Sequence, residues 1–225
     1  LFSTGDELIM PGEPLPPGAI YNSNRSTLRG LLEALGCAVT DLGIVPDRLD
    51  ATRAALRTAA ADHDLILTSG GVSLGEEDHI KAAVEAEGRL DAWLVAMKPG
   101  KPVAFGRIGT DDGAAFIGLP GNPVSSFVTF LMLVRPFLLR LQGVQEVQPK
   151  TVALPAHFTW GKADKRREFL RVWRNPQGGL DLFPHQGSGV LTSAVWGDGL
   201  VDNPAGTTIA PGDLVAFVSF TELLS

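Results

Sequence analysis

Hydrophobic positions in the first two thirds of the chain alternate between short continuous runs and runs with helical spacing. Leucines recur at helical spacing within residues 26–35, which predicts an amphipathic helix ended by Gly36. Further helices are predicted at 49–61, 78–86 and 123–141, and buried strands at 37–45, 64–68, 92–97, 103–108 and 114–119. This alternation is typical of a layered α/β fold with a mostly parallel sheet.

The pattern changes after residue 147, where short alternating runs are separated by Gly, Pro and Asn clusters. Such runs are typical of a small all-β domain that forms a sandwich or barrel. We therefore expect two domains, an α/β domain over 1–147 and a β-barrel-like domain over 148–225. Within the first domain, residues 109–113 predict a hairpin loop between two strands.

Composition indicates an ordinary globular protein, with 225 residues, 44% hydrophobic and 20% charged. Residues 127–141 are the most apolar stretch, but Arg135, Pro136 and Arg140 interrupt it. We expect a buried helix there, too short and too charged to cross a membrane. The net charge of -6 argues against general binding to nucleic acid, which needs a basic face.

Cysteine and histidine usage limits the redox and metal chemistry. Cys37 is the single cysteine, so an intramolecular disulfide is excluded; a reduced core thiol and a cytoplasmic location are expected. The four histidines lack ligand-like spacing, which disfavours zinc or iron and leaves metals with oxygen ligands. The sequence starts at Leu1 without Met or a signal-peptide pattern, so we expect a piece of a longer protein.

Polar or glycine-rich loops follow several of the predicted strands. They occupy residues 3–7, 45–47, 69–78 and 98–101. In open α/β sheets, ligands bind beyond the carboxyl ends of the strands, where such loops gather. We therefore expect these four loops to converge on one edge of the sheet.

Gly70 and Gly71 allow two interpretations. They form a tight turn between strand and helix, or they let backbone N–H groups approach an anion while Ser73 donates its hydroxyl. The loop lacks the Lys-Ser/Thr ending of a P-loop and the glycine spacing of a dinucleotide-binding fold. An ordinary nucleotide-binding fold is therefore disfavoured.

Six carboxylates fall in these loops and would repel one another if they shared a cleft without a cation. They are Asp6, Glu7, Asp47, Glu76, Glu77 and Asp78. Mg²⁺ typically takes one or two protein carboxylates together with phosphate and water, so two of the six suffice. Glu76 and Glu77 fit the first turn of a helix, which leaves Asp47 and Asp78 as the better candidates.

Lys98 and Lys101 are either solvated loop lysines or ligands for an anion. Prolines at 99 and 102 stiffen their loop, so the two ammonium groups lose less entropy on binding. Asn122 and Pro123 are a suitable cap and first residue for a helix, whose free N–H groups also favour anions. Ser125 adds a hydroxyl to the first turn of that helix.

The β domain offers weaker candidates. Basic residues concentrate in 162–174, which is either a solvated hairpin or a place where Arg171 aims its guanidinium at an oxyanion. Residues 185–188, His-Gln-Gly-Ser, form a plausible polar turn.

Several motifs resemble, in order and at compatible spacing, the molybdopterin molybdenumtransferases, the MoeA family, whose animal relative is the C-terminal region of gephyrin. They are Ser-Thr-Gly-Asp-Glu-Leu at 3–8, Tyr-Asn-Ser-Asn at 21–24, Ser-Gly-Gly-Val-Ser at 69–73, Lys-Pro-Gly-Lys-Pro at 98–102, Gly-Leu-Pro-Gly-Asn-Pro-Val-Ser at 118–125 and His-Gln-Gly-Ser at 185–188. The resemblance implies a molybdopterin-binding α/β domain in three layers and a small C-terminal β-barrel. It also implies Mg²⁺-dependent insertion of molybdenum from molybdate into adenylylated molybdopterin, with release of AMP.

Matching the motifs residue by residue implies specific roles. Asp47, Asp78, Lys98 and Lys101 would be catalytic, and Asp47, Asp78 and Glu7 would hold Mg²⁺. The substrates would contact Thr4, Gly70, Gly71, Ser73, Pro120, Asn122, Pro123 and Ser125, with Arg171 and Ser188 approaching molybdate from the β domain and Ser193 as a rival to Ser188.

Two departures from the family pattern bear on activity. Leu94 stands where some members carry a lysine after the tryptophan, and the family's N-terminal domains, which help to form a homodimer, are missing from this sequence. One alternative is therefore a non-catalytic molybdopterin-binding or scaffold module. Another is a related protein of the same fold acting on other nucleotides or pterins, which the β domain disfavours. No nucleic-acid or membrane partner is expected.

Overall fold

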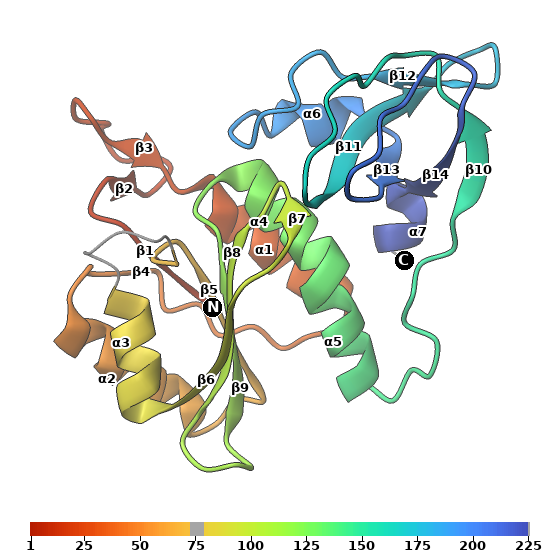
Figure 1. Ribbon diagram of the computed structural model, residues 1–225. Helices are drawn as coiled ribbons and strands as arrows, with labels where there is room; N and C mark the ends of the chain where they lie inside the picture. The colour runs from red at the N-terminus through yellow and green to blue at the C-terminus, as the bar shows by residue number, and fades with distance from the viewer. Residues whose placement is uncertain (73–78, 225) are drawn as a thin grey trace.

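The first part of the chain is built on a six-stranded sheet in the order β4-β1-β5-β9-β8-β6 (Figure 1). The computed structural model describes residues 1–72 and 79–224. The strands are β1 (Phe2–Thr4), β4 (Ile44–Val45), β5 (Leu65–Ser69), β6 (Gly88–Leu94), β8 (Pro102–Ile108) and β9 (Ala114–Leu119). Strands β4, β1, β5 and β9 are parallel, while β8 pairs antiparallel with both β9 and β6. The expected α/β fold with a mostly parallel sheet is confirmed.

Helices cover both faces of this sheet and give three layers. Ile66 packs in one core cluster with Leu56 of α2 (Leu49–Ala60) and with residues of α3 (His79–Glu87). Its neighbour Leu67 packs in the other cluster, with Leu28 of α1 (Ser23–Ala34). Successive strand residues point to opposite faces, so one continuous apolar strand serves two cores.

Two element boundaries differ from the sequence predictions near α1. The helix begins at Ser23 because the Asn22 side chain accepts a hydrogen bond from the Arg25 N–H. The strand expected over 37–45 shrinks to Ile44–Val45. The Asp41 carboxylate accepts a hydrogen bond from the Gly43 N–H, and this turn delays the strand until Ile44.

The strand expected over 92–97 is wrong in position, because two separate strands share this stretch. Strand β6 ends at Leu94, and β7 (Met97–Lys98) leaves the first sheet to pair with a strand of the second domain. Register shifts between Leu90 and Leu94 explain the change, because such irregularities bend a strand away from its partner.

One long helix runs from Pro123 to Leu141 and contains a π-helical turn. Its parts are α4 (Pro123–Thr129), η1 (Phe130–Val134) and α5 (Arg135–Leu141). Pro136 has no N–H, so it cannot donate a helical backbone hydrogen bond. The wider π-helical turn before it accommodates this missing bond. The helix is long and apolar enough to cross a membrane by length and composition, so the expectation that it is too short was wrong. As expected, however, it is mostly buried within the protein.

The second domain is an antiparallel sheet in the order β10-β14-β13-β11-β12. Its strands are β10 (Val152–Pro155), β11 (Arg167–Arg174), β12 (Leu180–Leu182), β13 (Gly199–Asn203) and β14 (Leu214–Ser219). A parallel bridge between Ala156 and Leu180 joins the two outer strands, so the sheet curls into the barrel-like form that was expected. Two short helices, α6 (Thr192–Trp196) and α7 (Phe220–Leu224), were not predicted.

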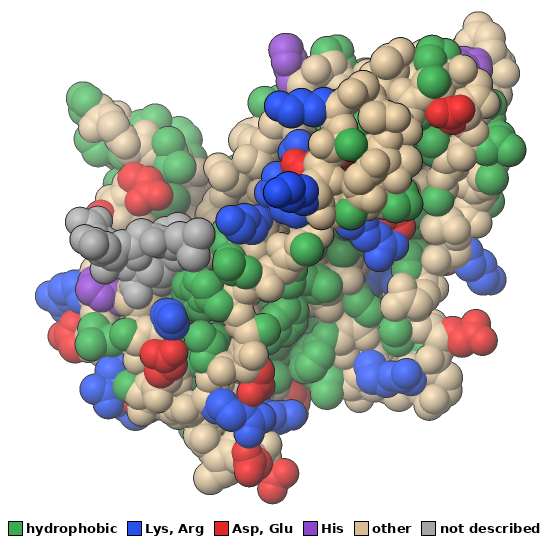
Figure 2. Space-filling view, viewed as in Figure 1, with side chains coloured by type: hydrophobic (Ala, Val, Ile, Leu, Met, Phe, Trp, Pro, Cys, Tyr) green, Lys and Arg blue, Asp and Glu red, His purple; other side chains and the backbone are tan. Residues whose placement is uncertain are grey.

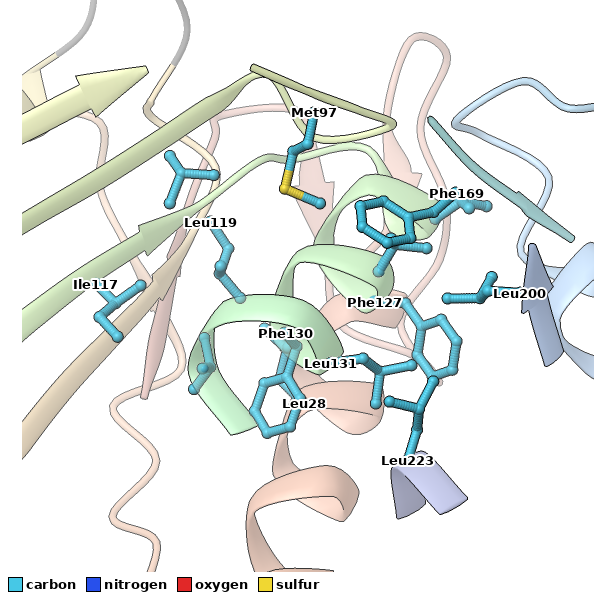
Figure 3. Packing of buried hydrophobic residues seen from close by; sticks show 14 of the residues in the cluster. Leu28, Met97, Ile117, Leu119, Phe127, Phe130, Leu131, Phe169, Leu200 and Leu223 are labelled. Atoms are coloured by element: carbon cyan, nitrogen blue, oxygen red, sulfur yellow. The ribbon is translucent and has the colours of Figure 1, made fainter. Parts of the chain in front are cut away.

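The two domains share one hydrophobic core. Phe127 of α4 packs edge-on against Phe220 at 5.5 Å between ring centroids. Figure 3 shows Phe127 facing Leu200 and Leu223 of the second domain. The β domain is therefore fixed against the long helix by apolar contact, which positions its loops over the start of α4.

Candidate functional site

A cleft of about 720 Å³ lies at the carboxyl edge of the parallel strands. Its walls come from the loops after β1, β4, β5 and β9 and from the segment that contains β2 (Leu8–Ile9) and β3 (Ile20–Tyr21). Figure 2 shows the surface hollowed between the projecting β2–β3 arm and the second domain. The volume lies within the usual range of small-molecule sites, and the position is where open α/β sheets bind ligands.

Most of the residues expected to meet substrate, and two of those expected to hold Mg²⁺, come together in this cleft. Those among its lining are Thr4, Glu7, Asp47, Gly70, Gly71, Pro120, Asn122 and Pro123. The convergence follows from the parallel sheet, which brings the ends of β1, β4, β5 and β9 to one edge. Ser73 and Asp78 lie outside the described residues.

Gly70 and Gly71 are required by the close approach of Thr4. Both have positive φ angles, +89° and +65°. A Cβ on Gly70 would lie 2.4 Å from the Thr4 carbonyl oxygen, and one on Gly71 would lie 2.5 Å from the Thr4 hydroxyl. The two glycines therefore let β5 end directly against the end of β1, which brings their backbone to the floor of the cleft.

Asn24 ties two walls of the cleft together. Its side-chain amide donates to the Ser69 hydroxyl and to the Gly121 carbonyl, both at 2.7 Å, and the residue is buried. This links α1 to the last residue of β5 and to the loop after β9. Sequence reasoning missed Asn24 as a site residue, although the Tyr-Asn-Ser-Asn motif at 21–24 was the signal that pointed to it.

Two buried polar atoms in the cleft wall have no hydrogen-bond partner among the described residues. They are the hydroxyl of Thr4 and the amide nitrogen of Asn22, on side chains that are 3% and 2% exposed. Buried polar groups in folded proteins are nearly always paired, so these two atoms leave unused hydrogen-bonding capacity in the wall of the cleft.

Glu7 and Asp47 are the carboxylates that line the cleft within the described part of the chain. Over residues 1–72 and 79–224, no group of three His, Cys, Asp or Glu side chains could hold a metal by itself. Two carboxylates nevertheless fit Mg²⁺, which usually takes its remaining ligands from phosphate and water. Glu7 and Asp47 are therefore the described carboxylates of the cleft that could hold such an ion.

The start of α4 is built differently from the expectation. Asn122 makes no side-chain capping hydrogen bond; instead, its carbonyl accepts from the Ser126 N–H. The Val124 N–H donates to the backbone carbonyl of Ser188 at 2.9 Å. The β domain thus supplies a partner that we expected from a ligand, and Ser125 lies buried in the same turn, outside the cleft lining.

Lys98 and Lys101 do not line the cleft in this structure. The Lys98 ammonium pairs with Glu168 at 3.0 Å and with Asp164 at 3.3 Å. Burial lowers the pKa of Lys98, but the hydrogen bonds to Glu168 and Asp164 outweigh it and raise this pKa above the ordinary value. Lys101 is exposed. In this structure the Lys98 ammonium therefore takes part in an interdomain ion pair, and its expected contact with an anion stays a prediction.

Arg171 is a buried arginine whose guanidinium meets protein acceptors in this structure, while its expected contact with an oxyanion stays a prediction. It is 1% exposed, and burial lowers its pKa to about 10. Its guanidinium donates to the carbonyls of Gly187 at 2.9 Å and His185 at 3.3 Å, and to the Ser193 hydroxyl at 3.2 Å. Its donors thus hold the loop that carries Ser188 against α4.

Family models match almost the whole chain in two consecutive segments. Residues 1–140 match a model described as a probable molybdopterin binding domain, and residues 153–220 match the MoeA C-terminal region, domain IV. The chain belongs to the MoeA family. The cleft described above lies within the first of the two matched segments, while Arg171 and Ser188 lie within the second.

Curated relatives and a solved structure agree with this assignment. The chain is 40% identical to a molybdopterin molybdenumtransferase of Haemophilus influenzae, over 100% of this chain and 56% of that protein. It is 35% identical to molybdopterin molybdenumtransferase 2 of Mycobacterium tuberculosis, over 95% of this chain and 56% of that protein. The crystal structure of a molybdopterin biosynthesis MoeA protein from Pyrococcus horikosii superposes with a TM-score of 0.82 at 29% identity, covering 97% of this chain and 53% of that one. The chain spans about half the length of the curated relatives it matches.

Proposed function

We propose that the whole protein inserts molybdenum from molybdate into adenylylated molybdopterin and releases AMP in the presence of Mg²⁺. The observation that carries the proposal is the cleft, because a MoeA-family sheet brings carboxylates, glycine backbone and unpaired buried donors to one place. The relatives named molybdopterin molybdenumtransferase support the same reaction. The proposal includes a cytoplasmic location and a homodimeric whole protein.

The residues of the cleft would have two roles, as hydrogen-bond donors and as metal ligands. The Thr4 hydroxyl and the Asn22 amide would donate to the phosphate or pterin of the ligand, which pairs both buried groups. Glu7 and Asp47, with Asp78 from outside the described residues, would hold Mg²⁺. When bound there, Mg²⁺ would neutralise charge on the phosphoanhydride that is cleaved to release AMP.

The direct test measures AMP release by the purified whole protein, given adenylylated molybdopterin, molybdate and Mg²⁺. Asp47→Asn is expected to lower the rate about tenfold or more, because it removes a charged ligand from the metal. Asp50→Asn is the matched control, since Asp50 lies on α2 with an exposed side chain that pairs with Arg48. Equal rates for Asp47→Asn and the wild type would sink the role of Asp47.

Thr4→Val tests the unpaired hydroxyl. The substitution preserves shape and removes a buried group that has no partner among the described residues, so stability should hold or rise. Binding of adenylylated molybdopterin, followed by calorimetric titration, should weaken about five- to tenfold. Thr52→Val removes an equally buried unpaired hydroxyl on α2, away from the cleft, and should leave binding unchanged. A similar loss of binding in both variants would contradict a ligand contact by Thr4.

A second candidate is a molybdopterin-binding or scaffold module without turnover. One observation favours it: none of the described residues that line the cleft is a lysine or an arginine, since Lys98 and Arg171 are engaged elsewhere. Titration with molybdopterin separates the two candidates. Binding by the whole protein without AMP release would favour the scaffold.

A further inference from the structure

The two domains are joined by a pair of strands as well as by the shared core. Strand β7 of the first domain runs parallel to the start of β11, with Lys98 opposite Glu168 in the register. The Arg167 N–H also donates to the Ala96 carbonyl at 3.0 Å. The backbone therefore places the Lys98 and Glu168 side chains beside each other.

Glu168 is a buried carboxylate whose partners come from three segments of the chain. The residue is 1% exposed. One oxygen accepts from Lys98 Nζ at 3.0 Å, and the other accepts from Trp160 Nε1 at 2.7 Å and from Asn203 Nδ2 at 3.3 Å. A buried carboxylate without its cation is an uncompensated charge, so Glu168 depends on Lys98.

Lys98 is held on its other sides as well. Its ammonium lies 5.8 Å from the centre of the Trp160 ring and 3.3 Å from Asp164. Asp164 is in turn fixed by Arg166, whose guanidinium donates to both carboxylate oxygens at 2.9 Å. The ammonium thus occupies one defined position although its side chain is 41% exposed.

The loop that follows Lys98 reaches the cleft through Pro102, which is part of the lining. Between them, Gly100 has a φ of +109° and lies so close to α4 that an added Cβ would be 2.2 Å from the Thr129 hydroxyl. The loop is therefore fixed at its start by Glu168 and in its middle by α4. A shift of Lys98 would reach the cleft wall through a short segment whose backbone is restricted by Pro99 and Pro102.

We propose that Glu168 is a positioning residue for the proposed reaction: it holds Lys98, and with it the 98–102 loop, in the place that the substrate cleft requires. This inference rests on the proposed function. Glu168 itself is separated from the ligand, because its oxygens are filled by Lys98, Trp160 and Asn203.

Glu168→Gln is the informative variant. A glutamine oxygen can still accept from Trp160 and Asn203, while its amide replaces the oxygen that faces Lys98. In the whole protein we expect the KM for adenylylated molybdopterin to rise about tenfold or more, with a smaller change in kcat. Glu168→Asp keeps the carboxylate, so its KM should rise less than that of Glu168→Gln.

A double-mutant cycle separates positioning from a merely structural role. Lys98→Met should raise KM by as much as Glu168→Gln, and the double variant should be no worse than either single variant. Asp202→Asn is the control: Asp202 pairs with Arg167 on the adjacent strand, so it should lower the melting temperature and leave KM unchanged. The proposal would be overturned if the KM increases of the two single variants multiplied in the double variant. An equal rise of KM in Asp202→Asn would also overturn it.

A failure of the proposed function is recognised separately. If the wild-type whole protein releases no AMP, NMR titration of ¹³Cε-labelled lysine still reports on Lys98, assigned by the signal lost in Lys98→Met. A lower pKa of Lys98 in Glu168→Gln than in the wild type then supports the pairing. An unchanged pKa overturns it.

Discussion

Gly71→Ala is expected to destabilise the protein by about 2–4 kcal/mol and to distort the floor of the cleft. The φ of +65° strains any residue with a Cβ, and the added carbon would meet the Thr4 hydroxyl at 2.5 Å and the Ile80 side chain at 2.7 Å. Thr4 lies at the end of a short buried strand and Ile80 is 1% exposed, so neither can move freely. Urea unfolding measures the loss of stability, and titration with adenylylated molybdopterin measures the distortion.

Gly109→Ala is the matched control. Gly109 has a φ of +88° and nothing within 4 Å of an added Cβ, so it carries the backbone strain without the clash. Its expected cost is about 1–2 kcal/mol, with ligand binding unchanged. Equal losses of stability in the two variants would show that Thr4 and Ile80 yield, and would contradict a rigid floor.

Arg171→Met is expected to cost about 3–5 kcal/mol of folding free energy. Methionine fills much of the same space, but it leaves the carbonyls of His185 and Gly187 and the hydroxyl of Ser193 without their donor. The loop should loosen, and with it the hydrogen bond from the Val124 N–H to Ser188. Denaturant unfolding gives the cost, and amide hydrogen exchange at Val124 should become faster.

Arg174→Met provides the comparison on the same strand. The Arg174 side chain is 61% exposed and lies 3.9 Å from Asp198, so its loss should cost less than about 1 kcal/mol. Hydrogen exchange at Val124 should stay at the wild-type rate in this variant. If Arg171→Met also leaves that rate unchanged, Arg171 does not support the start of α4.

The cleft could be predicted from the sequence because its position follows from topology. Once the apolar runs are assigned to parallel strands, the loops with Thr4, Asp47 and Gly70 must gather at one edge. The hairpin between β8 and β9 was equally readable, since its five turn residues separate two runs of buried residues. Each of these inferences starts from the assignment of strands and turns, which depends on residues close in sequence.

The destinations of the basic side chains could not be predicted in the same way. Lys98 and Glu168 are 70 residues apart, and the pairing of β7 with β11 that joins them leaves no periodic signal. A lysine or arginine beside a cleft has the same sequence pattern whether it faces a ligand or a protein acceptor. For Arg171 the deciding partners are backbone carbonyls, which every residue possesses.

Asn24 shows the same limit on a smaller scale. It was visible as part of a motif, but its role depends on Ser69 and on Gly121, which is 97 residues away. The strand expected over 92–97 failed for a related reason, because the irregularities in β6 depend on its fit to β8.

The pairing of β7 with β11 also bears on how the protein is made. During translation the N-terminal part of a chain emerges and folds first. Strand β7 is then already present when Arg167 and Glu168 leave the ribosome, and its backbone groups can pair with β11. The Lys98 ammonium, which compensates the Glu168 carboxylate, is present as well. A β domain synthesised first would present an unpaired strand edge and a buried charge without its counter-ion. With this order of domains, the partners of Arg167 and Glu168 are already synthesised when these residues emerge.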